Sequence, residues 1–193
     1  MTLIPIVEGH SEQESVPVLL RRLLAGYPVA RPFRIKRGKI VQPGEIERSL
    51  VLALADRPNP SCVVVIIDAD DDCPAELGPR LLERCKAVTN LPVSVVLANR
   101  EIEAWFLGGI ESLRGHRGIR VDAVWEGDPE GPRGAKGRLE ELMVEKSYVT
   151  VDDQPALMSA LDVETARTRC RSLDKLLRDL DHLLDQARRT GMA

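Results

Sequence analysis

The chain has 193 residues, of which 44% are hydrophobic, and its 27 basic and 30 acidic residues give a formal net charge of −3. This length suits one well-packed domain, and the balanced charge excludes a global field that would attract nucleic acid or a membrane surface. The four cysteines are scattered, without a Cys-x-x-Cys pair or histidines at zinc-ligand spacing, which indicates a reduced, cytoplasmic protein. Because no apolar run approaches roughly 20 residues and no secretion signal is visible, we expect no membrane partner.

The first third of the chain predicts two strand–helix units. Residues 3–7 form an apolar run that predicts a strand ending at Glu8, and the capping-box pattern of residues 11–14 predicts the start of a helix. A second short strand is predicted near residues 33–36, and after a loop a helix is predicted over residues 46–55.

The clearest predicted strand runs from Cys62 to Ile67, whose β-branched residues suit a central parallel strand covered by helices on both faces. A helix through Leu81 and Cys85 and a fourth strand over residues 93–98 follow it. This alternation predicts an α/β fold with a Rossmann-like, doubly wound parallel sheet of about four strands flanked by helices.

The second half of the chain lacks this alternation. Residues 126–137 are rich in glycine, proline and charge, so we expect an exposed loop there. Leucines at helical spacing over residues 173–184 predict a final helix that Ser172 caps. We therefore expect a single compact domain, with a core over residues 1–110 and a loop and helical C-terminal extension over residues 111–193 packed on that core.

Acidic residues follow two of the predicted strands. Glu8 follows the first strand, and Asp68 and Asp70 follow the third. Functional groups of open parallel sheets collect at the carboxyl ends of the strands, so these carboxylates meet if the two strands are neighbours. Asp68 and Asp70 are two residues apart on a segment expected to be extended, which points both side chains the same way. A hard divalent cation neutralises such a cluster best, and the alternative is a solvated turn that caps the next helix.

Two other motifs are excluded by the residues present. An EF-hand loop starting at Asp68 would have Cys73 in place of its glycine and Pro79 in place of its final glutamate. The chain also has no Gly-x-x-x-x-Gly-Lys-Ser/Thr motif, so work driven by ATP must come from a separate polypeptide.

The segments 7–12 (VEGHSE) and 67–70 (IDAD) resemble the two signature motifs of Toprim domains, which occur in topoisomerases, primases, recombination proteins and OLD-type nucleases. The segment 99–106 (NREIEAWF) resembles a family of Toprim-like proteins of uncharacterised function, often encoded beside ATPases in bacterial defence-like settings. Residues 146–161 and 171–180 are also similar to that family. The resemblance therefore covers nearly the whole chain and implies a Toprim-like fold.

The resemblance also implies roles for individual acids. Glu8 corresponds to the glutamate that acts as general acid/base or metal ligand, and Asp68 and Asp70 correspond to the acids that hold magnesium. A further acid after the fourth strand falls on Glu103 in preference to Glu101. The implied metal ligands are thus Glu8, Asp68, Asp70 and Glu103, with Glu8 and Glu103 catalytic and Mg²⁺ or Mn²⁺ as cofactor. The alternative for residues 101–106 is an ordinary helix with buried aromatic residues and solvated acids.

A local basic run borders the second predicted strand, within residues 31–39. Such a run can bind along a phosphate backbone, although these residues are explained almost as well as ordinary surface charges that keep the protein soluble. The few aromatic residues argue against a base-stacking platform. The candidate nucleic-acid contacts are Arg34, Lys36, Arg37 and Lys39. Weaker candidates for a phosphate or a proton are His10, Lys136 and Lys146; His10 is equally explained as a polar side chain of a turn, and Lys136 as an exposed charge.

The function that these patterns favour is metal-dependent phosphoryl transfer or phosphodiester cleavage on nucleic acid, in a defence system with a separate ATPase partner. The alternative is a non-catalytic Toprim-like module that binds nucleic acid, a nucleotide or a partner protein. A third alternative is a small-molecule phosphatase or kinase-like transferase that uses the same ions.

Overall fold

The computed structural model describes residues 1–131, 133–145 and 147–191. Its centre is a four-stranded sheet with the strand order β2-β1-β3-β4, in which every neighbouring pair is parallel. The predicted α/β fold with a parallel sheet is confirmed. The strands are β1 (Thr2–Val7), β2 (Phe33–Arg34), β3 (Pro60–Asp68) and β4 (Val93–Ala98).

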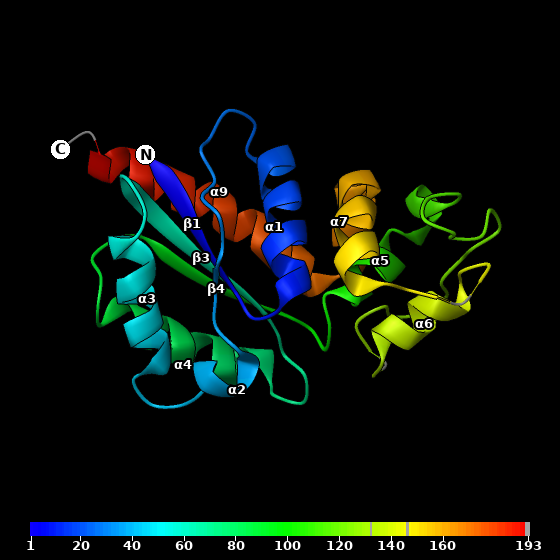
Figure 1. Ribbon diagram of the computed structural model, residues 1–193, viewed down its shortest axis with the longest axis horizontal. Coiled ribbons are helices and arrows are strands. Elements are labelled where there is room, and N and C mark those ends of the chain that lie inside the picture. The colour runs from blue at the N-terminus through cyan, green and yellow to red at the C-terminus, as the bar shows by residue number, and fades with distance from the viewer. Residues whose placement is uncertain (132, 146, 192–193) are drawn as a thin grey trace.

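Helices cover both faces of the sheet (Figure 1). One face packs against α1 (His10–Leu23) and α9 (Arg171–Gly191), through strand residues such as Val64 and Val96. The other face packs against α3 (Glu45–Ala55) and α4 (Pro74–Lys86), through the alternate strand residues. Because β3 is buried on both faces, it is the continuous β-branched run that the sequence shows.

The strand order places a topological switch point between β1 and β3. The chain leaves β1 through α1 on one face, whereas it leaves β3 through α4 on the other face, and the two strands are paired with Val7 opposite Ile66. In open α/β sheets such a point opens a crevice at the carboxyl ends of the strands. Glu8 and Asp68 therefore reach the same crevice from adjacent strands.

The second half of the chain forms a helical region beside this crevice. Helix α7 packs on α1, and α5 packs on α6 and α8, at the side of the molecule away from α3 (Figure 1). A single hydrophobic cluster joins residues of the sheet, such as Val64, to Trp105 and Leu157 of this region. The elements are α5 (Glu103–Gly108), η1 (Ile110–Leu113), α6 (Ala135–Glu141), α7 (Thr150–Ala160) and α8 (Val163–Arg169).

Two local predictions are wrong and a third holds only in part. Helix α2 (Arg37–Ile40) occupies a segment expected to be loop. The segment 126–137 is only partly exposed, because Glu130 is 4% exposed and accepts hydrogen bonds from the backbone N–H groups of Arg171 (2.9 Å) and Ser172 (3.0 Å). Glu130 thus caps α9, and Ser172 lies inside that helix as a donor to the same carboxylate. None of the helices in the described ranges is long and apolar enough to cross a membrane.

Candidate functional site

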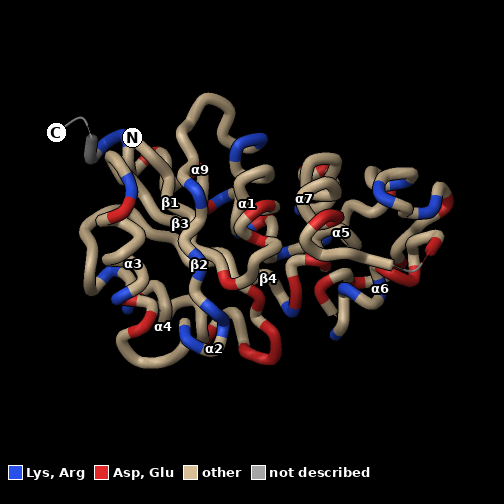
Figure 2. Tube along the Cα trace, in the orientation of Figure 1, with Lys and Arg blue, Asp and Glu red and all other residues tan. Residues whose placement is uncertain are grey.

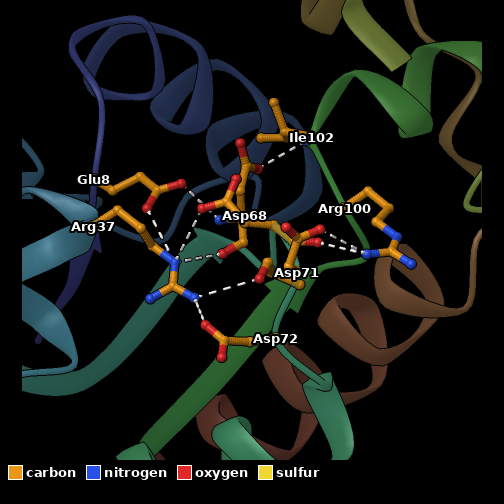
Figure 3. A network of polar contacts seen from close by, with 9 residues as sticks. Glu8, Arg37, Asp68, Asp71, Asp72, Arg100 and Ile102 are labelled. Atoms are coloured by element: carbon orange, nitrogen blue, oxygen red, sulfur yellow. Dashed lines mark hydrogen bonds and ion pairs between the residues drawn. The ribbon is translucent and has the colours of Figure 1, made fainter. Parts of the chain in front are cut away.

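Glu8 and Asp68 meet at the switch point. The backbone N–H of Asp68 donates a hydrogen bond to Glu8 Oε1 at 2.8 Å, and Asp68 Oδ1 accepts one from the backbone N–H of Ile102 at 2.9 Å (Figure 3). The two contacts join the end of β1, the end of β3 and the connection from β4 to α5. Two of the predicted site residues therefore share one crevice, as their places after neighbouring strands led us to expect.

Two further acids complete a buried group that we call the inner acids. Glu103 is 5% exposed at the start of α5, and Glu12 is 8% exposed in the first turn of α1. Gln154 of α7 lies between them, and its Nε2 donates to Glu103 Oε1 (3.3 Å) and to Glu12 Oε1 (3.4 Å). Its Oε1 accepts from the Ser15 hydroxyl at 2.7 Å, which orients the amide. The inner acids are Glu8, Glu12, Asp68 and Glu103.

Burial and repulsion by neighbouring acids disfavour the charged forms of Glu8, Asp68 and Glu103. Burial raises the pKa of Glu8 to about 7, although the Asp68 N–H and Arg37 act in the opposite sense. Burial also raises the pKa of Glu103 to about 7. The pKa of Asp68 is raised well above its usual value by burial first, and then by the charges of Glu8, Glu103 and Glu12. The inner acids therefore need a cation or protons to be stable together.

Two buried carboxylate oxygens in this group, Glu8 Oε2 and Glu12 Oε2, have no hydrogen-bond partner among the described residues. Gly9 lies directly against Glu12, because a Cβ atom at this position would be 1.9 Å from Glu12 Oε2. The predicted capping box is wrong: Gly9 is the N-cap of α1, no side chain caps the helix, and Glu12 turns into the crevice. Glu12 is thus a site residue that the sequence analysis missed.

A second group, the outer acids Asp70, Asp71 and Asp72, lies on the turn after β3. Their side chains are 60%, 66% and 54% exposed, respectively. Asp70 has a left-handed backbone (φ +51°), so the segment turns after Asp68, and the extended geometry predicted for the two acids is wrong. Asp70 still lies near Glu8, since its charge raises the pKa of that residue.

Arginines neutralise the outer acids (Figure 3). Arg37 Nε donates to the backbone oxygen of Asp68 at 3.0 Å and lies 3.6 Å from Asp70 Oδ2, and the same guanidinium forms an ion pair with Asp72. Arg37 Nε is also 3.8 Å from Glu8 Oε2. Arg37, expected to contact nucleic acid, is therefore the cation between the outer acids and Glu8.

The rest of the basic run lies along the same edge, and Figure 2 shows Lys and Arg along β2 and α2. Arg34 is half-buried, and its Nη1 donates to the backbone oxygen of Glu8 at 3.5 Å. Lys36 and Lys39 are exposed. The run thus borders the acids through Arg34 and Arg37 and offers two free lysine side chains beyond them.

The other candidates lie apart from the inner acids or at their border. Glu101 Oε2 accepts from the backbone N–H of Lys136 at 2.9 Å, at the start of α6. The exposed Lys136 side chain lies over the ring of Tyr148, 5.9 Å from its centroid. Buried Tyr148 adjoins Glu103, a contact between segments far apart in sequence that no motif indicated. His10 is exposed, and Lys146 lies outside the described residues.

The inner acids fit a hard divalent cation by chemistry. They offer only oxygen ligands, which Mg²⁺ and Mn²⁺ prefer, and the oxygens of Glu8 and Glu12 without hydrogen-bond partners are buried where a cation would stabilise them. No three His, Cys, Asp or Glu side chains of the described ranges are close enough to hold an ion as they stand. Binding an ion therefore requires the carboxylates to move together around it.

Comparison with known proteins gives a family match. A family model described as a domain of unknown function, DUF4276, matches residues 7–181. No curated protein and no solved structure matches the chain. The matched range contains all four inner acids together with Gln154. Because the match covers most of the chain, this protein belongs to the DUF4276 family.

Proposed function

We propose that this chain is a Mg²⁺- or Mn²⁺-dependent enzyme of phosphoryl transfer or phosphodiester cleavage on nucleic acid, built around a Toprim-like site. The observation that carries the proposal is the pair of buried carboxylate oxygens of Glu8 and Glu12 that accept no hydrogen bond from the described residues, next to Asp68 and Glu103 at the β1/β3 switch point. Glu12 has no described cation beside it and Glu8 has one, Arg37, at 3.8 Å, so burying carboxylates here is costly unless a ligand compensates them.

Glu8, Asp68 and Glu103 would hold the ion, with Glu12 and Asp70 at its border. When bound, the ion would polarise a phosphodiester and stabilise negative charge on the leaving oxygen. Glu8 and Glu103 each have a pKa of about 7, which suits a group that takes up or releases a proton at neutral pH.

Other residues of the chain position these acids. Gln154 is fully buried and holds Glu103 and Glu12 through one amide, itself fixed by Ser15. Arg37 lies at the open side of the crevice, where it balances the outer acids and can contact a phosphate.

The basic run supports a nucleic-acid substrate, and the absence of a Walker motif supports a separate ATPase partner. Arg34, Lys36 and Lys39 lie beside the acids, so a polyanion that contacts them passes the crevice. An ATPase partner would be a separate polypeptide, because the chain has no Walker motif. The four free thiols suit a reducing cytoplasm.

A cleavage assay tests this proposal. Wild-type protein is incubated with single- and double-stranded DNA and RNA in Mg²⁺, in Mn²⁺ and in chelator. We expect metal-dependent cleavage that Asp68→Asn and Glu12→Gln each lower by on the order of a hundredfold, because each change removes a carboxylate from the ion's surroundings. Glu14→Gln is the matched control: Glu14 is exposed on α1, two residues from Glu12.

Two outcomes would contradict the proposal: cleavage that persists in chelator, or cleavage that neither Asp68→Asn nor Glu12→Gln lowers. A second candidate is a non-catalytic Toprim-like module that binds nucleic acid or a partner. The observation that favours it is the position of Arg37, whose guanidinium forms ion pairs with Glu8 and the outer acids and so supplies positive charge where a metal ion would. Binding of the same substrates without any cleavage, in either metal, would support this second candidate.

A further inference from the structure

Strand β4 is an edge of the sheet, with β3 as its single neighbour in the described part of the chain. Its pairing to β3 includes hydrogen bonds from Val63 N to Pro92 O and from Ala69 N to Ala98 O, both at 2.9 Å. Since backbone groups alternate in direction along a parallel strand, the even-numbered residues of β4 face β3. The N–H and C=O groups that face outward belong to Val93, Val95 and Leu97.

This free edge lies at the bottom of a groove. Two cavities of about 640 Å³ and 500 Å³ follow β4 between α4 and α9, and they share Leu82 of α4 and Lys175 of α9 in their walls. The first contains Val93, and the second contains Val95 and Leu97. Edge strands of soluble proteins are usually covered or blunted, so an edge left open in a groove is a template for another strand.

The charge around the groove is unbalanced. Lys86, Arg171 and Arg189 line it, and none of these three side chains has an acidic partner among the described residues. The two acids of the groove are already paired. Asp179 forms an ion pair with Lys175 and accepts a hydrogen bond from Ser94.

Glu130, the other acid, binds the first N–H groups of α9. The groove therefore presents positive charge that the protein itself does not neutralise. None of the four inner acids lines either cavity, so this surface is separate from the candidate metal site.

We propose that the groove along β4 binds an extended, acidic segment of a partner protein, which adds a fifth strand to the sheet. Backbone hydrogen bonds to Val95 and Leu97 supply affinity whatever the partner's sequence. Alternate side chains of the segment face the apolar wall of α4 at Pro79 and Leu82. Acidic side chains of the segment meet the unpaired cations. A second copy of the chain fits less well, because two such grooves would bring like charges together.

A defined peptide tests the proposal. The probe is a short fluorescent peptide of alternating valine and glutamate, and its control has lysine in place of glutamate. We expect the glutamate peptide to bind about tenfold or more tightly than the lysine peptide, an advantage that falls at high salt. Backbone amide exchange gives an independent readout. Val95 and Leu97 should gain protection with the peptide, whereas Val96, whose backbone faces β3, should already be protected without it.

Two kinds of variant locate the binding. Val95→Pro removes one outward N–H without touching the ladder to β3, and we expect about tenfold weaker binding. Lys86→Glu with Arg189→Glu reverses the charge on exposed helix positions and should weaken binding at least as much. Arg80→Glu makes one such charge reversal, on an exposed position of α4 outside the groove, and should leave binding unchanged; Lys86→Glu alone is its matched counterpart.

The charge-reversal pair keeps the test decisive if Val95→Pro does not fold. The proposal is overturned if the lysine peptide binds equally, if Arg80→Glu weakens binding as much as the pair, or if Val95 and Leu97 gain no protection. Self-association through β4, seen by sedimentation and lost in Val95→Pro, would assign the groove to a second copy instead.

Discussion

The inner and outer acids meet at the end of β3, where Asp68 is followed by Asp70, and the two groups differ in how their charge is balanced. The outer acids are more than half exposed and pair with Arg37, Arg100 and Arg133. Among the inner acids, Glu12 and Glu103 are buried and held by Gln154, Glu8 and Asp68 are partly buried, and only Glu8 has a described cation nearby, Arg37 at 3.8 Å. The outer group is thus complete within the chain, whereas the inner group is stable only with protons or with a cation from outside.

The boundary between the two groups falls inside one acidic run. Asp68 is the last residue of β3 and is held by the backbone N–H of Ile102, while Asp70 turns outward with φ +51°. A run of acids in a sequence therefore does not act as one ligand set, because the end of the strand divides it.

The largest effect should come from Asp68. A divalent ion that binds only the folded protein stabilises it by mass action, about 2.7 kcal/mol at a hundred times Kd. Asp68→Asn removes both a ligand and a source of repulsion, so it should melt at the same or a higher temperature in chelator and lose most of the increase with Mg²⁺. Thermal melts of both proteins, with chelator and with magnesium, measure this. An equal metal response in both would refute the assignment of Asp68.

Gly9 should matter nearly as much, through Glu12. Its φ of −104° suits any residue, so an effect of Gly9→Ala must come from the added Cβ, which would be 1.9 Å from Glu12 Oε2. We expect a loss of about 1–3 kcal/mol in the free energy of unfolding, typical of overpacking, and a reduced metal response. Urea denaturation with and without Mg²⁺ provides both values. Glu12→Gln/Gly9→Ala should show no further loss of metal response than Glu12→Gln alone.

The stability of the metal-free protein should depend on pH in a direction opposite to that of ordinary carboxylates. The pKa of Glu8 and of Glu103 is about 7 in the folded protein, against 4.5 as the usual value. Between these values the folded state binds more protons than the unfolded state, so the free energy of unfolding should fall as pH rises from about 5 to about 8.

Denaturation in chelator across this range measures the slope, and Asp68→Asn should flatten it by removing a carboxyl group whose own pKa is raised in the folded protein. With Mg²⁺ the slope should reverse, because metal ligands must be deprotonated. A metal-free protein that gains stability on going from pH 5 to pH 8 would mean that the inner acids are already compensated within the chain.

The sequence predicted where the strand-end acids of this site meet, but not all of the residues that surround them. Glu8 and Asp68 could be placed together because strand ends are readable from β-branched runs and parallel strands share an edge. Glu12 lies inside residues 11–14, a segment that fits a capping box, and only its position against Gly9 shows that it belongs to the crevice. Gln154 lies 142 residues from Glu12, and no local pattern encodes a contact of that range.

Neutralising lysines of the basic run should have a smaller effect, which is on the affinity for nucleic acid. Each lysine that contacts a phosphate contributes about 0.9 to the slope of log affinity against log salt on duplex DNA. Lys36→Gln with Lys39→Gln should therefore lower the slope by about 2, while metal-induced stabilisation stays as in wild type. Titrations of labelled duplex at several salt concentrations measure it. An unchanged slope would mean that these lysines are ordinary surface residues.

The smallest effect should come from Asp71, which is the most exposed of the outer acids. Its side chain is 66% exposed and pairs with Arg100 at 3.3 Å and with Arg133 at 2.6 Å, and the latter is itself 74% exposed. Exposed pairs of this kind contribute about 0–1 kcal/mol, because water screens the attraction and ordering long side chains costs entropy. Asp71→Asn should therefore change the free energy of unfolding by less than about 1 kcal/mol, and by still less at high salt.

Because the same chemical change at Asp68 is expected to remove the metal response, this variant is its matched control, and its response to Mg²⁺ should equal that of wild type. A large destabilisation by Asp71→Asn, or a lost metal response, would show that the outer acids belong to the metal site and that the division at the end of β3 is not real.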